Sequence, residues 1–125
     1  MPIDATQPYD PGNIFAKILR GEIPCDKVYE DEWALAFRDI APQAPVHLLV
    51  IPKGAYVGWD DFTASASEEE IAGFVRAVGR IAREHDLVGP GYRLLVNLGG
   101  HGGQEVPHLH VHLFGGRPLG PMIAR

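Results

Sequence analysis

The sequence predicts an α+β domain built on an antiparallel sheet. Short segments of strand character outnumber segments of helical character, and the strands come in pairs without a helix between each. One segment, residues 68–85, carries apolar side chains at helical spacing, and a shorter helical segment, residues 14–20, precedes the first strands. We therefore expect about five strands with one long and one short helix. The 125 residues correspond to one domain.

The N-terminal part is expected to hold a loose segment followed by the short helix. Residues 1–12 are polar and rich in proline, so we expect a flexible lead-in to a single domain over residues 13–125. Asn13 is a candidate N-cap for the helix at residues 14–20, and Gly21 is expected to end that helix.

Three strand segments follow the short helix. Residues 28–29 and 34–38 are expected to form two short strands on either side of an acidic turn. Residues 47–51, His-Leu-Leu-Val-Ile, contain a continuous apolar run, and Pro52 would close it. We therefore expect a buried strand at this position.

The long helix has a sequence signature at its N-terminus. Ser67 and Glu70 have the spacing of a capping box, with Ser67 at the N-cap and Glu70 at N3. The apolar residues that follow recur at helical spacing and predict a helix over residues 68–85. The rest of the chain is expected to form a strand over residues 92–98, a glycine-rich loop over residues 99–103 and a last strand over residues 108–114.

Composition and charge exclude several classes of protein. The net charge of −5 argues against broad binding of nucleic acid or of anionic membranes, which normally needs a basic surface. The chain has no apolar stretch of roughly 18 residues and no apolar core of a signal peptide. Cys25 is the only cysteine, so no disulfide can form within the chain. We expect a cytoplasmic protein with no nucleic-acid or membrane partner.

Three histidines alternate with apolar residues near the C-terminus. Because side chains of a strand alternate between its two faces, His108, His110 and His112 would share one face. The apolar residues between them would anchor the other face in the core. The histidine face must then point at solvent, at a ligand or into a cleft. Exposed strand faces more commonly carry threonine, lysine or glutamate, so the pattern favours a functional site.

A metal site and a nucleophilic site are the two candidate chemistries. The first and last histidines of such a strand lie roughly 13 Å apart, so three of them cannot easily meet one zinc ion. Two of them could share a metal with His47 or Asp39. Alternatively, a neutral imidazole attacks phosphorus while the flanking histidines donate protons. The glycine-rich loop at residues 99–103 favours this second chemistry, because its backbone N–H groups can approach an anion.

Residues 108–114, His-Leu-His-Val-His-Leu-Phe, fit the signature His-φ-His-φ-His-φ-φ, with φ apolar, and resemble the histidine-triad (HIT) superfamily, in particular its Hint branch. The resemblance spans nearly the whole chain, through residues 14–24, 36–45, 47–53, 102–106 and 115–117. It implies the HIT fold and a homodimer whose sheet continues across both copies. It also implies hydrolysis of purine nucleoside phosphoramidates, and of aminoacyl-adenylates, through a nucleotidyl-histidine. The partner would be a purine nucleotide, a conjugate of AMP or GMP.

The resemblance also implies roles for individual residues by motif position. His110 would be the nucleophile, His112 would contact the phosphate, and His108 and His47 would orient the nucleophile. Asp39 would bind the ribose hydroxyls. The base pocket would be formed by Ile18, Phe37 and Ile40, and the surroundings of the phosphate and leaving group by Asn97, Gly103, Gln104 and Glu105.

Two departures from the family pattern affect these expectations. Many relatives hold a structural zinc through cysteines at the positions of Asn13 and Ala16, so we expect no zinc and no other cofactor here. Glu105 stands where some members have serine. Its carboxylate would repel a phosphate, so it must either point away or meet a cationic leaving group.

Other functions remain open at this stage. A dinucleoside-polyphosphate hydrolase belongs to the same superfamily, but Gly115, Gly116 and Arg117 after the triad favour the Hint branch. A nucleotide-binding or scaffolding protein with incidental catalysis is a second alternative. The intact His110 argues against it.

Overall fold

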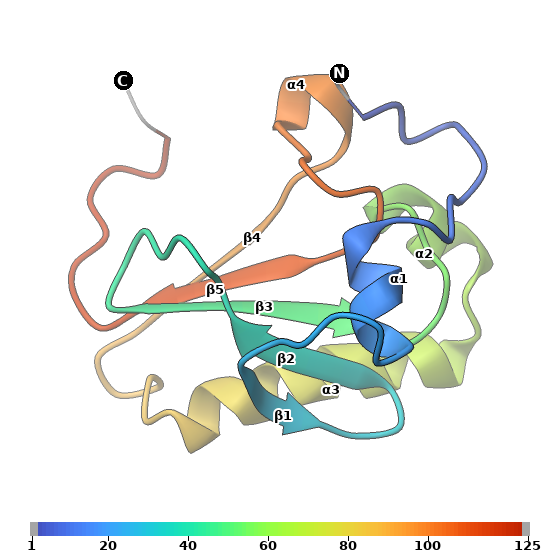
Figure 1. Cartoon of the computed structure of the whole chain (residues 1–125). Helices are drawn as coiled ribbons and strands as arrows, with labels where there is room; N and C mark the ends of the chain where they lie inside the picture. Colours follow the sequence, from blue (N-terminus) through green and yellow to red (C-terminus); the bar gives the residue numbers. More distant parts are fainter. Residues whose placement is uncertain (1–2, 124–125) are drawn as a thin grey trace.

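The computed structural model describes residues 3–123 and has the α+β architecture that the sequence predicts (Figure 1). The sheet has five strands in the order β1-β2-β3-β5-β4, and all neighbours are antiparallel. The strands are β1 (Lys27–Glu30), β2 (Ala34–Arg38), β3 (Val46–Pro52), β4 (Arg93–Val96) and β5 (Val111–Gly115). The helices are α1 (Ile14–Leu19), α2 (Trp59–Ser65), α3 (Glu68–Glu84) and the single turn α4 (Gly99–Gly102). Within residues 3–123, no helix combines the length and apolar character that a membrane span needs.

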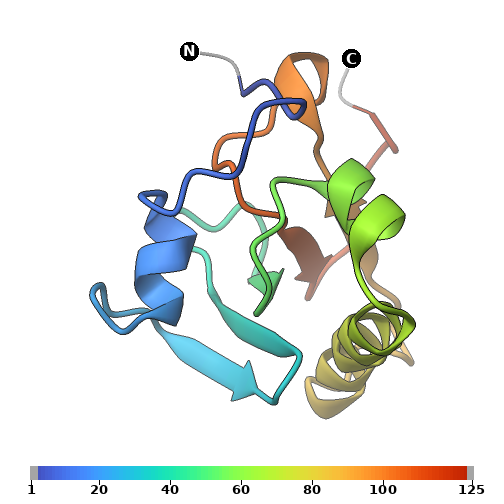
Figure 2. The ribbon, with the colours of Figure 1, turned by 90° about the vertical axis from the view of Figure 1, so that its right-hand side faces the viewer.

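The sheet separates two apolar clusters, and Figure 2 shows α1 and α3 on opposite sides of it. On one side, Phe74 and Ile81 of α3 belong to the larger cluster, which includes alternate residues of the strands. On the other side, Phe15 of α1 packs with Phe37 and Leu49 in the smaller cluster. The histidine-bearing face of the sheet is this second face, which α1 covers only in part.

The helix starts follow the capping chemistry expected from the sequence. Asn13 accepts a hydrogen bond from the Ala16 amide at 2.9 Å and caps α1. In the capping box of α3, Ser67 Oγ accepts from the Glu70 amide and Glu70 Oε1 accepts from the Ser67 amide, both at 3.1 Å. Both predicted N-caps are therefore confirmed. The helix α3 ends at Glu84, one residue before the predicted end.

The helix α2 is absent from the sequence-based prediction. Only Phe62 is buried in it, so it lacks the apolar stripe that reveals α3. Instead, the Asp61 carboxylate accepts from the amides of Val57 and Gly58, both at 2.8 Å, and this satisfies donors at the start of the helix. The glycine-rich loop likewise contains one helical turn, α4, where only a loop was expected.

The last strand begins later than predicted. The expected strand at residues 108–114 pairs with β3 and β4 only from Val111 onward, so His108 and His110 precede β5. The Leu109 amide donates instead to the Tyr56 carbonyl, beyond the end of β3, at 2.9 Å. This part of the chain is therefore hydrogen-bonded to the segment after β3 rather than to β3 itself. Because β5 begins at Val111, which pairs with Val96, the ladder of β4 also ends there. The strand β4 is therefore shorter than the predicted residues 92–98.

Candidate active site

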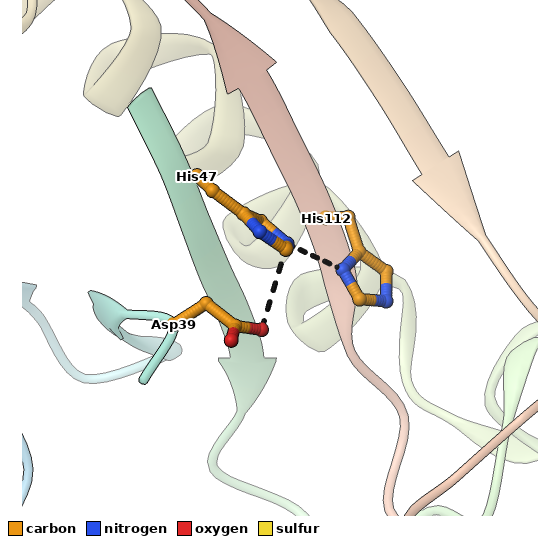
Figure 3. Close-up of side chains that lie close together, drawn as sticks. All are labelled: Asp39, His47 and His112. Atoms are coloured by element: carbon orange, nitrogen blue, oxygen red, sulfur yellow. Dashed lines mark hydrogen bonds and ion pairs between the residues drawn. The ribbon is translucent and has the colours of Figure 1, made fainter. Parts of the chain in front are cut away.

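His47 and His112 lie side by side on the histidine-bearing face of the sheet. In the β3–β5 ladder, His47 is opposite Phe114 and Leu49 is opposite His112, so the two histidines are diagonal neighbours. His47 Nε2 lies 2.9 Å from His112 Nδ1 and 3.5 Å from Asp39 Oδ2 (Figure 3). Asp39 follows β2 directly, and its amide donates to the His47 carbonyl at 3.0 Å. The backbone thus brings three functional side chains from two strands and a strand end together.

The main chain determines which nitrogen of His47 carries the proton. The Gln43 amide can only donate, and it lies 3.1 Å from His47 Nδ1. The proton of neutral His47 is therefore on Nε2, which donates to His112 Nδ1. Neutral His112 must then carry its own proton on Nε2. Burial lowers the pKa of His47 and lowers that of His112 to about 4, so both rings are neutral near pH 7.

The main chain determines the opposite arrangement in His110. The His108 carbonyl can only accept, and it lies 2.8 Å from His110 Nδ1. Nδ1 therefore carries the proton, and Nε2 keeps a free lone pair. Burial lowers the pKa of His110, while the hydrogen bond to the His108 carbonyl and then the carboxylates of Glu105 and Asp39 oppose that shift. His110 is thus a neutral imidazole with an unprotonated Nε2, which is the form that acts as a nucleophile.

His108 is fully buried. Its Nε2 lies 3.0 Å from the Pro52 carbonyl, and its Nδ1 lies 2.7 Å from the Tyr9 hydroxyl. Burial lowers the pKa of His108 to about 4. The rings of His108 and His110 both meet the Phe15 ring edge-to-face. Phe15 therefore contacts both His108 and His110, while His108 also contacts Tyr9.

A cavity of about 200 Å³ lies over this arrangement. Seven of the residues singled out from the sequence line it: Asp39, His47, Asn97, Gly103, Glu105, His110 and His112. Residues that the sequence analysis did not single out complete the wall: Phe15, Ala41, Gln43, Leu49 and Val106. The alternation of side chains along a strand could have predicted that Leu49 faces the site, since it lies two positions after His47 on the same strand. The positions of Phe15 and Gln43 depend on how α1 and the β2–β3 loop fold over the sheet.

Besides His108, four predicted site residues lie outside this lining. Phe37 is buried in the smaller apolar cluster, and Ile18 packs against that cluster. Ile40 is fully exposed beside the site. The buried Gln104 amide donates to the carbonyls of Val57 and Val106, at 2.7 and 3.0 Å, and accepts from the Gly99 amide at 3.0 Å. Its side chain therefore ties the glycine-rich segment to the start of α2 and does not face the cavity.

Asp39, His47 and His112 also match one geometry that the sequence left open. Among residues 3–123, these three offer ligand atoms within 4.8 Å of one another, as a small metal site would. The hydrogen bond between the imidazoles of His47 and His112 is one reason for their approach, and a shared metal ion would be another. Metal binding therefore remains the alternative chemistry for this cluster.

Comparisons with known proteins agree with the fold and with the motif. The HIT domain family matches residues 20–119. An uncharacterized HIT-like protein of Azospirillum brasilense is 66% identical over 117 residues, which cover 94% of this chain and 96% of the relative. The purine nucleoside phosphoramidase of Escherichia coli K12 is 49% identical over 111 residues, 89% of this chain and 92% of that enzyme. A histidine triad protein from Clostridium difficile superposes with a TM-score of 0.80 at 41% identity, covering 88% of this chain and 95% of the other.

Proposed function

The chain belongs to the HIT domain family, and from this premise we propose that it hydrolyses the P–N bond of purine nucleoside phosphoramidates, and also aminoacyl-adenylates. The observation that carries the proposal is the state of His110, a buried neutral imidazole whose Nδ1 proton is engaged and whose Nε2 is unprotonated. The relative named purine nucleoside phosphoramidase supports the substrate class.

The proposed reaction has two displacements at phosphorus. The Nε2 lone pair of His110 attacks the α-phosphorus, and the P–N bond breaks as the departing nitrogen takes up a proton from solvent and leaves as an amine. Water then attacks the nucleotidyl-histidine, loses a proton to solvent, and releases the nucleoside monophosphate and neutral His110. His112, with its proton on Nε2, donates a hydrogen bond to a phosphate oxygen and stabilises the charge that develops there.

The nucleotide is placed by groups around the histidines. Asp39 accepts from the Ala41 amide through Oδ1 at 2.8 Å and offers its remaining acceptor sites to the ribose hydroxyls. Ile40, which is fully exposed and follows Asp39 in the sequence, and partly buried Ile18 supply apolar surface for the base, and Phe37 supports that surface from within the smaller apolar cluster. Asn97, Gly103 and Glu105 line the same cavity. In the proposed complex, Asn97 and Gly103 contact the phosphate, and the Glu105 carboxylate meets a cationic leaving group.

The test is hydrolysis of adenosine 5′-phosphoramidate by the wild type and by His110→Ala. We expect a loss of roughly four orders of magnitude or more in kcat, as for other enzymes that lose a nucleophile, with fold and AMP affinity retained. A near-normal rate in the variant would make the nucleophile assignment wrong. A folded wild type that binds AMP without turnover would indicate a binding protein instead.

Metal analysis of the purified protein tests the alternative chemistry, because near-stoichiometric zinc would support a metal site at Asp39, His47 and His112.

We also propose that two copies associate along β4. This strand is at one edge of the sheet, and an apolar groove of about 390 Å³ runs beside it on the α3 side. Large exposed apolar side chains line the groove: Trp59, Val75, Tyr92 and Leu94. The cytoplasmic location inferred from the sequence stays a prediction.

A further inference from the structure

We propose that Tyr9 is a positioning residue for the histidine site, acting through His108 on the nucleophile His110. The Tyr9 hydroxyl lies 2.7 Å from His108 Nδ1, although the two residues are 99 positions apart in the sequence. The two rings also meet edge-to-face, with centroids 5.6 Å apart. Its effect on turnover rests on the proposed function, whereas its contact with His108 does not.

The direction of the hydrogen bond follows from the other partner of His108. The Pro52 carbonyl only accepts, so the proton of neutral His108 is on Nε2. Nδ1 is then an acceptor, and the Tyr9 hydroxyl donates to it. His108 is fully buried, so without this hydroxyl its Nδ1 would lose its donor inside the core, which is a costly state for a polar atom.

The link to catalysis runs through the His108 carbonyl. That carbonyl accepts the Nδ1 proton of His110 and thereby sets which nitrogen of the nucleophile is free. His108 and His110 both precede β5, so the sheet ladder does not hold them in register. The amide of Leu109, in the same peptide unit as this carbonyl, is held by the Tyr56 carbonyl. The side chain of His108 is held separately, by the hydrogen bonds of its ring with the Tyr9 hydroxyl and the Pro52 carbonyl.

Tyr9 is itself tied to the helix that covers the site. The next residue, Asp10, accepts through its carbonyl from the amide of Asn13 at 3.3 Å and from the Asn13 side chain at 2.8 Å. Asn13 caps α1, which carries the Phe15 ring against His108 and His110. The N-terminal segment and α1 are therefore linked to each other, and both contact His108.

The experiment compares Tyr9→Phe, which removes only the hydroxyl, with Thr6→Val as control. Thr6 lies in the same segment, and its hydroxyl bonds to exposed Asp4 rather than to the site. Imidazole ¹⁵N spectra report the proton positions in His108 and His110. Single-turnover kinetics with adenosine 5′-phosphoramidate report the displacement step without product release.

We expect the His108 Nδ1 resonance of Tyr9→Phe to move toward the position of an acceptor without a donor. The His110 resonances should shift with it, and the single-turnover rate should fall about tenfold, because small displacements of reacting groups cost rate. KM and AMP affinity should stay within about twofold, since Asp39 and His47 are untouched. Thr6→Val should match the wild type in every measurement.

Three outcomes would overturn the proposal. Unchanged His108 resonances would show that the hydroxyl makes no such bond. Unchanged His110 resonances, or an unchanged rate despite a shifted His108, would show that Tyr9 positions nothing in the nucleophile. If the wild type itself does not turn over, the proposed function fails alone, and the His110 resonances of Tyr9→Phe still decide the positioning role.

Discussion

Main-chain groups determine different tautomers for the chemically identical side chains of His47 and His110 in this site. The ring of His47 meets an amide donor from Gln43, so it presents an N–H to its neighbour His112. The ring of His110 meets a carbonyl acceptor, so it presents a lone pair. Burial keeps the rings neutral by lowering their pKa, and the backbone then selects the tautomer. The difference between the hydrogen-bond donor His47 and the proposed nucleophile His110 therefore comes from which backbone group each ring meets.

The carboxylate of Glu105 gives a test of this electrostatic balance. Its charge raises the pKa of His110 against the lowering by burial, so Glu105→Gln should let that pKa fall further. The proposed nucleophile would then stay neutral to lower pH, and the acid limb of the kcat/KM profile should move to lower pH. The measurement is the pH dependence of kcat/KM with adenosine 5′-phosphoramidate. Glu69→Gln, on an exposed position of α3, serves as control, and a shift toward higher pH in Glu105→Gln would contradict this electrostatic role.

The proposed ribose contact of Asp39 can be separated from its contact with His47. Asp39→Ala should weaken AMP binding about tenfold or more, because hydrogen bonds to a charged acceptor are worth about 1.5–3 kcal/mol. The loss for 2′-deoxy-AMP should be smaller, since that ligand lacks one of the two hydroxyls. Calorimetric titration of both ligands into both proteins measures the difference. Equal losses would assign Asp39 to the histidine network alone.

At the scale of elements, the sequence predicts best what depends on local pattern. The capping box at Ser67 and the helical spacing after it place α3 to within one residue. The start of β5 could not be placed in this way, because it depends on where β3 ends and on the Tyr56 carbonyl that takes the Leu109 amide. The site follows the same rule. Alternation reveals the triad histidines, whereas the contacts of Gln104 and Tyr9 join segments distant in the sequence.

One glycine in α3 tests how tightly this helix packs on the β1–β2 turn. A Cβ at Gly73 would lie 2.3 Å from the Trp33 ring, so Gly73→Ala should destabilise the fold by about 1–3 kcal/mol through overpacking. An ordinary helix interior would instead gain about 1 kcal/mol from the same change. Ala72→Gly, at the neighbouring exposed position, gives the intrinsic difference between the two residues in this helix.

Urea denaturation measures all three free energies of unfolding. If Gly73→Ala gains stability by the amount that Ala72→Gly loses, the Trp33 ring moves aside at no cost. The close packing of α3 on the turn would then not contribute to stability.

At the scale of the whole molecule, the two edges of the sheet differ in character. The edge strand β1 has an irregular register between Lys27 and Tyr29 and carries charged side chains, features that discourage pairing. The other edge, β4, has no strand on its outer side among residues 3–123, and exposed Leu94 lies on it. The apolar groove runs along this edge and away from the histidine cavity. Association along β4 would bury apolar surface and leave the site open.

This difference between the two edges predicts a dimer that a single charged substitution on β4 can disrupt. We expect sedimentation to show a wild-type dimer at micromolar concentration. Leu94 is 47% exposed and lines the groove, so Leu94→Arg should raise the dissociation constant at least about 30-fold, as removal of a central apolar contact does. Val88→Arg is the matched control, because Val88 is also exposed but lies outside the groove. A monomeric wild type would contradict the dimer itself. A dimer that survives Leu94→Arg but dissociates in Val88→Arg would place the interface on another surface.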